Sequence, residues 1–236
     1  MPLLKAKGNM YSWCSHVHNY LRGQCPHKCS YCYVQTGRQV VKDKYTGPIE
    51  LDAAELKVNH NTKDFKANPK TIFICHMTDL FAEEVPDNFI ALILRHCNTY
   101  PGHTYVFQTK NPGRMARHRY SWPPEMIRGT TIESNRAHKQ MGSAPLPIYR
   151  AEALGRLTGR KFVTIEPVMD FDLAGMQAIL HMARPNFICI GADSKGNNLD
   201  EPSPQKIKHL LMLVEEMGIE IRAKNNLERI LGSEEK

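Results

Sequence analysis

The chain has 236 residues, and its 31 Lys and Arg against 24 Asp and Glu give a net charge of +7 at pH 7. No run approaches the about 20 apolar residues of a membrane span, and residues 1–10 hold no apolar core of signal-peptide length. We therefore expect a cytosolic protein, outside any membrane, in which thiols stay reduced. The excess of cations favours a polyanionic partner.

Short β-branched or aromatic runs alternate with helical patterns along the chain. The expected strands are 16–21, 48–51, 71–76, 104–108, 128–132, 161–165, 186–190 and 219–222. The expected helices are 86–97, 112–120, 148–157, 173–183 and 204–217. This alternation predicts an α/β fold of about six β–α steps, with helices outside a parallel sheet, and leaves open whether the sheet closes. No linker or internal repeat divides the chain, so we expect one domain over residues 1–236.

Three cysteines follow the first expected strand with the spacing C-x3-C-x2-C, namely Cys25, Cys29 and Cys32. Three thiolates this close in sequence can bind three corners of a four-iron cluster, whereas iron–sulfur sites ordinarily use four cysteines. The next cysteine downstream is Cys75, inside an expected strand. One iron would therefore lack a protein ligand, and an open position is typical of catalytic metal sites.

A zinc site is the alternative interpretation, since zinc takes four ligands and His27 or His18 would complete the set. A disulfide framework is disfavoured because seven cysteines are an odd number in a long chain. The remaining cysteines lie in apolar stretches and are expected in the core; they are Cys14, Cys75, Cys97 and Cys189. His16 and His18 lie two apart on a strand and share one face, either toward the interior of a barrel or as structural residues.

The cysteine spacing resembles the signature of the radical S-adenosylmethionine (SAM) enzymes. This resemblance implies a [4Fe-4S] cluster on Cys25, Cys29 and Cys32, whose open iron binds SAM, with Tyr31 packed near SAM. It implies reductive cleavage of SAM to a 5′-deoxyadenosyl radical that abstracts a substrate hydrogen, with electrons from a donor such as flavodoxin or ferredoxin. It also implies a partial (β/α)6 TIM-like barrel with the cluster loop after the first strand.

Polar residues at the carboxyl ends of the strands are the candidates for binding SAM, because catalytic groups of parallel barrels lie at that edge. By the resemblance, the loop after the second strand contacts the SAM ammonium, and Thr78 and Asp79 occupy that place, where radical SAM enzymes usually have Gly-Gly-Glu. The end of the fourth strand commonly contacts the ribose and carboxylate. The candidates there are Thr131, Glu133, Ser134 and Arg136. Gly191, after the sixth strand, would let adenine approach the backbone.

Structural roles compete with these assignments. Asp79 can instead cap the turn at 80–81, and Glu133 or Glu166 can each be a structural ion-pair partner. Lys110 can be an ordinary solvated lysine.

Several further segments resemble a narrower group, spore photoproduct lyase and its relatives, which include phage-encoded proteins. They are the cysteine motif with Tyr33, and residues 77–81, 108–112, 131–133, 165–167 and 224–227. The resemblance implies hydrogen abstraction from a nucleic-acid base or nucleotide, most simply in DNA, by a repair lyase, an isomerase or a base-modifying enzyme. A phage-encoded protein would work in the host cytoplasm. The hydrogen-donor cysteine of spore photoproduct lyase has no assigned match in this chain.

A basic stretch after the third strand fits phosphate contact, and the aromatic residues Tyr120 and Trp122 beside it fit base stacking. The candidate substrate contacts are Lys110, Arg114, Arg117 and Arg119 in this stretch, with Glu166 and Lys224 at later strand ends. A solvated helix face is the competing interpretation. Chemistry on a base would require a flipped or single-stranded nucleotide.

Two other functions stay open from the sequence. One is a radical SAM enzyme acting on a small metabolite, and the other is a non-catalytic, metal-stabilised nucleic-acid-binding protein. The oligomeric state is also left open.

Overall fold

An eight-stranded, mostly parallel sheet organises the chain in the computed structural model, which describes residues 3–61, 68–117 and 120–232. Its strands, in spatial order, are β1 (Leu4–Lys5), β2 (His16–His18), β5 (Thr71–Ile74), β6 (Thr104–Thr109), β7 (Met126–Thr131), β8 (Lys161–Ile165), β9 (Phe187–Ile190) and β10 (Glu220–Ala223). Only β1 pairs antiparallel, with β2, and every other neighbouring pair is parallel.

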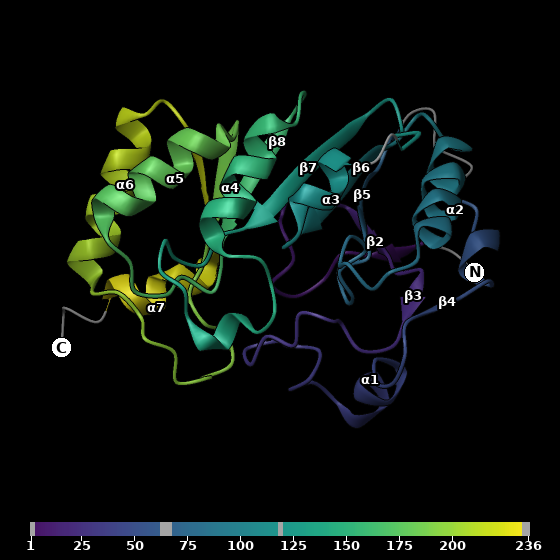
Figure 1. Cartoon of the computed structure of the whole chain (residues 1–236), viewed down its shortest axis with the longest axis horizontal. Helices are drawn as coiled ribbons and strands as arrows, with labels where there is room; N and C mark the ends of the chain where they lie inside the picture. Colours follow the sequence, from purple (N-terminus) through teal and green to yellow (C-terminus); the bar gives the residue numbers. More distant parts are fainter. Residues whose placement is uncertain (1–2, 62–67, 118–119, 233–236) are drawn as a thin grey trace.

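Helices connect the parallel strands in chain order, from one end of the molecule to the other (Figure 1). They are α1 (Gln39–Lys44), α2 (Asp87–Asn98), α3 (Pro112–Arg117), α4 (Pro147–Arg156), α5 (Leu173–Ala183), α6 (Pro204–Glu216) and α7 (Glu228–Leu231), with 3-10 turns η1 (Glu55–Lys57), η2 (Lys139–Met141) and η3 (Asn225–Leu227). Because crossovers between parallel strands are right-handed, a sequential strand order places the connecting helices on one face of the sheet.

Successive side chains of each strand point to opposite faces of the sheet. The two faces therefore pack against different parts of the chain. On the outer face, strand residues such as Ile72 and Val163 join the helices in one large core. On the inner face, Phe73 and Phe162 join a second core together with Tyr11 from the N-terminal segment. The inner face is thus filled by apolar side chains near the start of the strands, and polar side chains are left at their carboxyl ends.

The expected α/β fold with a parallel sheet and outer helices is confirmed, and its strand order is consistent with a partial TIM-like fold. Strands β1 and β10 end the order and do not pair with each other, so the sheet is not closed. The bounds of β8 and α5 are those expected from the sequence. The expected strand 16–21 was too long: it stops at His18, and Leu21–Arg22 (β3) pairs with Glu50–Leu51 (β4) in a separate ribbon.

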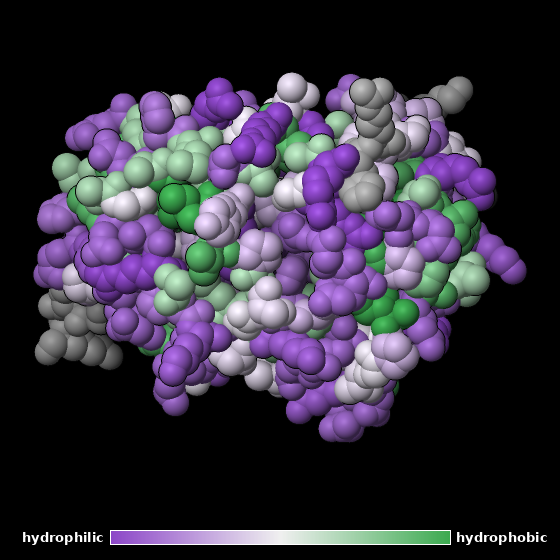
Figure 2. Space-filling view, viewed as in Figure 1, coloured by the Kyte–Doolittle hydropathy of each residue, from purple (hydrophilic) through white to green (hydrophobic). Residues whose placement is uncertain are grey.

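The sequence did not indicate α1, η1 or β1, because all three are short and bury little. None of the α1 residues is buried, so the helix lacks the apolar periodicity that reveals a helix in a sequence. Among the described residues, no helix is long and apolar enough to cross a membrane. The molecular face in Figure 2 is largely hydrophilic, with apolar residues in small separate groups.

Candidate functional site

The three cysteines lie on a loop that is tied to the carboxyl edge of the sheet. Thr78, after β5, donates its hydroxyl to the carbonyl of Gly23 at 3.2 Å, and the Tyr33 hydroxyl donates to the carbonyl of His76 at 2.6 Å. The segment after β7 approaches from the other side, where Ser143 N–H donates to the carbonyl of His27 at 2.8 Å. A β-carbon on Gly142 would lie 1.9 Å from that carbonyl, so this contact requires glycine.

All three loop cysteines carry free, half-buried thiols, as a metal-binding loop needs. The other four, Cys14, Cys75, Cys97 and Cys189, are free and buried in the two cores, which confirms that they are core residues. Burial raises the pKa of Cys25 to about 12, with a further contribution from Asp79. Because only the thiolate ligates a metal, binding at this loop would release protons.

Lys110 and Glu133 meet directly under the cysteine loop, each just beyond the end of its strand. Lys110 Nζ lies 2.5 Å from Glu133 Oε1, 2.5 Å from the Tyr31 hydroxyl and 3.2 Å from Cys29 Sγ. The Tyr31 hydroxyl also donates to Glu133, and Arg150 Nη1 donates to Glu133 Oε2 at 2.8 Å. One carboxylate therefore accepts from two cations and a phenol, and one of the cations reaches a cysteine sulfur.

The charges in this group stabilise one another strongly. Burial alone would raise the pKa of Glu133, but the Lys110 ammonium and the Arg150 guanidinium hold it well below its usual range. Burial alone would lower the pKa of Lys110, but Glu133, then Cys29, hold it above its usual value. Two cations therefore lie against one carboxylate, and one of them, the Lys110 ammonium, lies beside Cys29 Sγ.

Arg150 was not singled out from the sequence, although a signal was present. It lies on α4 four residues before the buried Leu154, and residues four apart share one face of a helix. A buried arginine on a core-facing position needs an anionic partner, because an unpaired buried charge is costly. That partner is Glu133, whose side chain is fully buried like that of Arg150.

Asp79 binds the cysteine loop to the end of β6 as well as capping its own turn. Its Oδ2 accepts from His27 Nε2 at 2.8 Å and from Lys110 N–H at 2.7 Å, while its Oδ1 accepts from Phe81 N–H at 2.9 Å. Burial would raise its pKa, but the His27 ring and these hydrogen bonds hold it below its usual value. The expected cap of the turn at 80–81 is therefore observed, and the contact of Asp79 with SAM stays a prediction.

The depressed pKa values of Asp79 and Glu133 predict acid-sensitive folding. Their contribution to stability is complete above the ordinary carboxyl pKa of about 4 and is lost as the pH falls below it. Lys110 has a raised pKa, so its contribution is complete below about pH 10.4 and is lost as the pH rises through the folded-state value. The urea concentration at the unfolding midpoint, measured at pH 7, 5 and 3, should decrease mainly below pH 4. The decrease should be less steep in a Glu133→Gln variant. Equal slopes in the two chains would contradict this.

A second polar group lies on the inner face, at the ends of β8 and β10. Glu166 Oε2 accepts from Lys224 Nζ at 2.7 Å, and its Oε1 accepts from Asn9 Nδ2 at 2.9 Å and Asn226 Nδ2 at 3.2 Å. A β-carbon on Gly191 would lie 2.9 Å from Glu166 Oε1, so glycine leaves room for this carboxylate. The two predicted residues Glu166 and Lys224 are therefore partners, and Asn9 joins them from the N-terminal segment.

The remaining predicted SAM contacts are spread along the end of β7. Thr131 points to the inner face, where its Oγ1 accepts from Gln108 Nε2 at 2.8 Å. Ser134 is buried and donates its hydroxyl to the carbonyl of Asp170 at 2.6 Å. Arg136 pairs with Asp170 and Asp172. In the described part of the chain, no hydrogen bond or ion pair joins Arg136 to the cysteine loop.

The basic stretch differs from its expected role. Arg114 is buried and donates to the backbone carbonyls of Ala82, Glu83 and Val85 and to Asp87, so its guanidinium is enclosed by the protein and not displayed toward a phosphate. Three of these acceptors precede α2 and the fourth, Asp87, is its first residue, and together they hold the guanidinium in the protein interior. Lys110 is likewise enclosed at the cysteine loop rather than displayed on a basic surface.

Of the other two arginines of this stretch, Arg117 is exposed and pairs with Glu83 at 2.5 Å, and Arg119 lies outside the described residues.

The contrast between Arg114 and Arg117 predicts unequal costs of substitution. Arg114→Ala leaves buried carbonyls without donors and should lower the free energy of unfolding by about 1–3 kcal/mol or more. Arg117→Ala removes an exposed pair and should change it by less than about 1 kcal/mol. Urea unfolding measures both, and similar values for the two would contradict the burial of Arg114.

A single zinc ion fits the cysteine loop poorly. With zinc–sulfur bonds of about 2.3 Å, two sulfurs on one ion lie at most about 4.6 Å apart. Among the described residues, the group of three metal-ligating side chains with ligand atoms within 4.8 Å of one another is His18, His60 and His96, not the cysteines. His18 lies in that separate histidine group, on the outer face of the sheet, and not at the cysteine loop.

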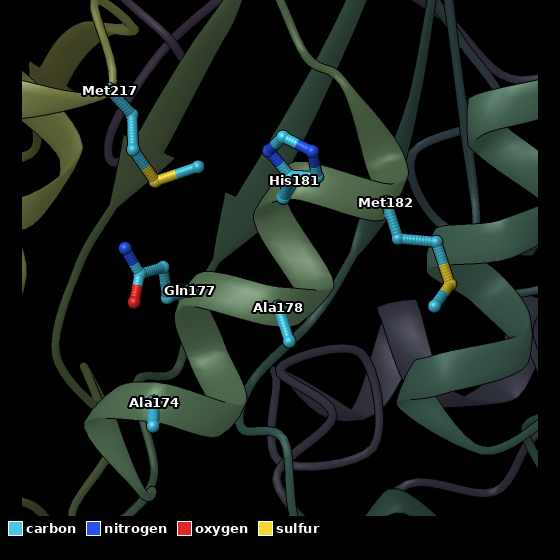
Figure 3. Close-up of a pocket in the computed structure, with 6 residues that line it drawn as sticks. All are labelled: Ala174, Gln177, Ala178, His181, Met182 and Met217. Atoms are coloured by element: carbon cyan, nitrogen blue, oxygen red, sulfur yellow. The ribbon is translucent and has the colours of Figure 1, made fainter.

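Two surface hollows lie away from the cysteine loop. One, of about 590 Å³, is formed by α5 residues from Ala174 to Met182 with Met217 opposite (Figure 3). The other, of about 730 Å³, lies beside α3 and α4 and includes Arg117, Arg128 and Arg156. Neither hollow is lined by a cysteine, by Lys110 or by Glu133.

Fold and site together describe a mixed α/β protein whose three-cysteine loop lies on the carboxyl edge of a parallel sheet. The chain belongs to the family described as protein of unknown function DUF5131, whose model matches residues 9–219. No curated protein matches it. A solved variant of spore photoproduct lyase with bound AdoMet and dinucleoside spore photoproduct has a similar fold, with a TM-score of 0.58 over 93% of this chain and 80% of that chain. The two sequences are 9% identical, so the similarity is one of fold.

Proposed function

We propose that this chain is a radical SAM enzyme with a [4Fe-4S] cluster on Cys25, Cys29 and Cys32. The observation that carries the proposal is the position of the three-cysteine loop on the carboxyl edge of a sequentially ordered parallel sheet, against Lys110 and Glu133. The similarity in fold to a spore photoproduct lyase supports the same class of protein. The radical SAM signature in the sequence, C-x3-C-x2-C, is independent of that similarity.

The donor set fits a cluster with one open iron. Three free thiols lie on the loop, and the other four cysteines are buried in the N-terminal segment, directly after β5, in α2 and in β9. Lys110 Nζ, 3.2 Å from Cys29 Sγ, supplies a positive charge beside one of the ligands. When bound, the cluster would supply the electron that cleaves SAM to methionine and a 5′-deoxyadenosyl radical.

The inner-face group beyond β8 and β10 fits a polar cofactor. Asn226 Oδ1 is buried and accepts no hydrogen bond from the described residues, although its amide nitrogen donates to Glu166 and Ser194. An amino or hydroxyl group of SAM would satisfy that oxygen. Asp79 and Thr78 would also position the loop, since they bind His27 and Gly23.

Anaerobic reconstitution with iron and sulfide tests the proposal. The reconstituted protein should be brown and, after reduction, should form 5′-deoxyadenosine from SAM. A colourless protein that retains one tight zinc ion at the cysteine loop, and no cleavage of SAM under reducing conditions, would overturn it. That result would favour a metal-stabilised binding protein without catalysis.

The proposed substrate is a nucleic-acid base or nucleotide, most simply in DNA, with a repair lyase, isomerase or base-modifying reaction. The net charge of +7 suits a polyanion, and the spore photoproduct lyase of similar fold holds a dinucleoside. A flavodoxin or ferredoxin would supply electrons in the cytosol, where thiols stay reduced. A small metabolite is the alternative substrate, and the binding experiment that follows distinguishes the two.

Salt-dependent binding of a single-stranded oligonucleotide is the expected result for a nucleic-acid substrate. The logarithm of the affinity should fall linearly with the logarithm of the salt concentration. Arg117→Ala should lower the slope by about one unit and weaken binding to oligonucleotides of any sequence by the same factor. Glu83→Gln, which frees Arg117 from its partner, should have the opposite effect on affinity and serves as the matched variant. Absence of binding at low salt would favour the small metabolite.

A further inference from the structure

A cluster of three buried histidines lies on the outer face of the sheet, apart from the cysteine loop. His18 ends β2, His60 lies in the connection after η1, and His96 lies in the last turns of α2. The three are 4%, 0% and 9% exposed, and one ring nitrogen of each lies within 4.8 Å of the others. We propose that these three histidines bind one divalent transition-metal ion, for which zinc is the natural probe.

The hydrogen bonds around the rings determine which nitrogens carry protons. His18 Nε2 lies 3.1 Å from the Glu55 carboxylate, so this nitrogen donates and Nδ1 holds a lone pair. His60 Nδ1 lies 2.9 Å from the Tyr105 hydroxyl, which donates its own proton to the carbonyl of Tyr100 at 3.0 Å. The Tyr105 oxygen therefore accepts from His60 Nδ1, and His60 Nε2 also holds a lone pair.

Two lone pairs thus face each other, because His18 Nδ1 lies 2.9 Å from His60 Nε2. In this tautomer, a cation between the two nitrogens makes the contact favourable. A neutral imidazole that presents such a lone pair is the form that binds metals.

The Tyr20 hydroxyl donates one hydrogen bond to the histidine cluster, but it faces two ring nitrogens. Its hydroxyl lies 2.7 Å from His96 Nδ1 and 3.2 Å from His60 Nε2, so it can satisfy only one of them. The His96 ring also has a hydrogen bond to the backbone of Val58. With an ion bound, the three facing nitrogens would be ligands and the Tyr20 oxygen would be near the fourth position.

The surroundings match those of known kinds of zinc site. Ligating histidines usually donate their second ring N–H to a carboxylate or another oxygen, as His18 does to Glu55 and His60 to Tyr105. Zinc–nitrogen bonds of about 2.0–2.1 Å place imidazole nitrogens about 3.3 Å apart, so the pair at 2.9 Å would need to open by about 0.4 Å. Glu55 would offset part of the charge, while Lys70, which donates to the carbonyl of His60 at 2.7 Å, opposes it.

An ion here would join three segments that are distant in sequence, just before the chain enters the cysteine loop. It would connect the end of β2 to α2 and to the segment after η1. The consequence would be a rigid base for residues 19–24, which lead to Cys25.

Zinc content of a chain without the competing thiolates is the direct test. A Cys25→Ala/Cys29→Ala/Cys32→Ala chain, equilibrated with zinc and desalted, should retain one zinc per chain. Adding His96→Gln should reduce this at least tenfold, whereas adding His16→Gln, a neighbour on β2 outside the cluster, should not. Zinc should also raise the melting temperature of the first and third chains but not of the second.

Cobalt titration of the chain with its native cysteines gives a second readout that does not depend on folding of the triple variant. The histidine site should give visible bands of a four-coordinate ion that survive Cys29→Ala and disappear in His96→Gln. If the histidine-dependent metal is absent in both experiments, and zinc leaves the melting temperature unchanged, the cluster is a neutral hydrogen-bonded network and the proposal is wrong. Neither readout depends on SAM cleavage, so this result is separate from the test of the proposed enzyme.

Discussion

Replacing Cys25, Cys29 or Cys32 by Ala should abolish SAM cleavage and remove most of the absorbance of the reconstituted cluster. Each thiolate would hold one corner of the cluster, and no other thiol of the described residues lies outside the cores to replace it. The loss should be complete within detection, because a cluster missing a ligand is not held in place. Absorbance and 5′-deoxyadenosine formation, both measured anaerobically, give two independent readouts.

Cys75→Ala is the matched control for these three variants. Cys75 is buried, and burial raises the pKa of its thiol to about 12, so it stays protonated and does not ligate metal. This variant should keep its cluster absorbance and its SAM cleavage, apart from a modest loss of stability. Full activity of Cys29→Ala, or loss of the cluster in Cys75→Ala with the fold intact, would show that the ligands have been assigned to the wrong cysteines.

Glu133→Gln should lower the free energy of unfolding by about 3–5 kcal/mol, the usual cost of removing one partner from a buried ion pair. The variant is nearly isosteric, so the loss would come from the charges of Lys110 and Arg150, which would stay buried with no carboxylate between them. Urea unfolding at pH 7 measures the change. We also expect weaker binding of the cluster, because Lys110 would no longer be held 3.2 Å from Cys29 Sγ.

Glu152→Gln provides the comparison for this effect on the same helix as Arg150. Glu152 is half exposed and pairs with Arg156 four residues on, so its substitution should cost less than about 0.5 kcal/mol. If Glu133→Gln is as mild as Glu152→Gln, the buried network under the cysteine loop does not carry the stability assigned to it here.

Local patterns in the sequence predicted the elements that obey a simple period. The bounds of β8 and α5 agree with expectation because a continuous apolar run and a helical apolar face are visible without tertiary information. The same patterns placed Asp79, Lys110 and Glu133 at strand ends on one edge of the sheet. Patterns failed where an element is short and exposed, as in α1, or where a strand changes partners, as after His18.

These patterns could not predict the partners of charged side chains. Arg114 and Arg117 are three residues apart in one basic stretch, yet one is buried against backbone carbonyls and the other is exposed. The partners of Arg114 come from residues 82–87, about 30 residues earlier in the chain. Charge and spacing alone cannot distinguish these two arginines, because the difference lies in which distant segment packs over them.

The sequence by itself determined the C-x3-C-x2-C motif, the α/β alternation and the cysteines that belong to cores, since each depends on neighbours within a few residues. Only the tertiary structure decided that Arg150 completes the pair of Lys110 and Glu133, and that His18, His60 and His96 meet on the outer face. These groups assemble from separate strands and helices. Their contacts depend on the packing of the whole sheet, and no period along the chain encodes that packing.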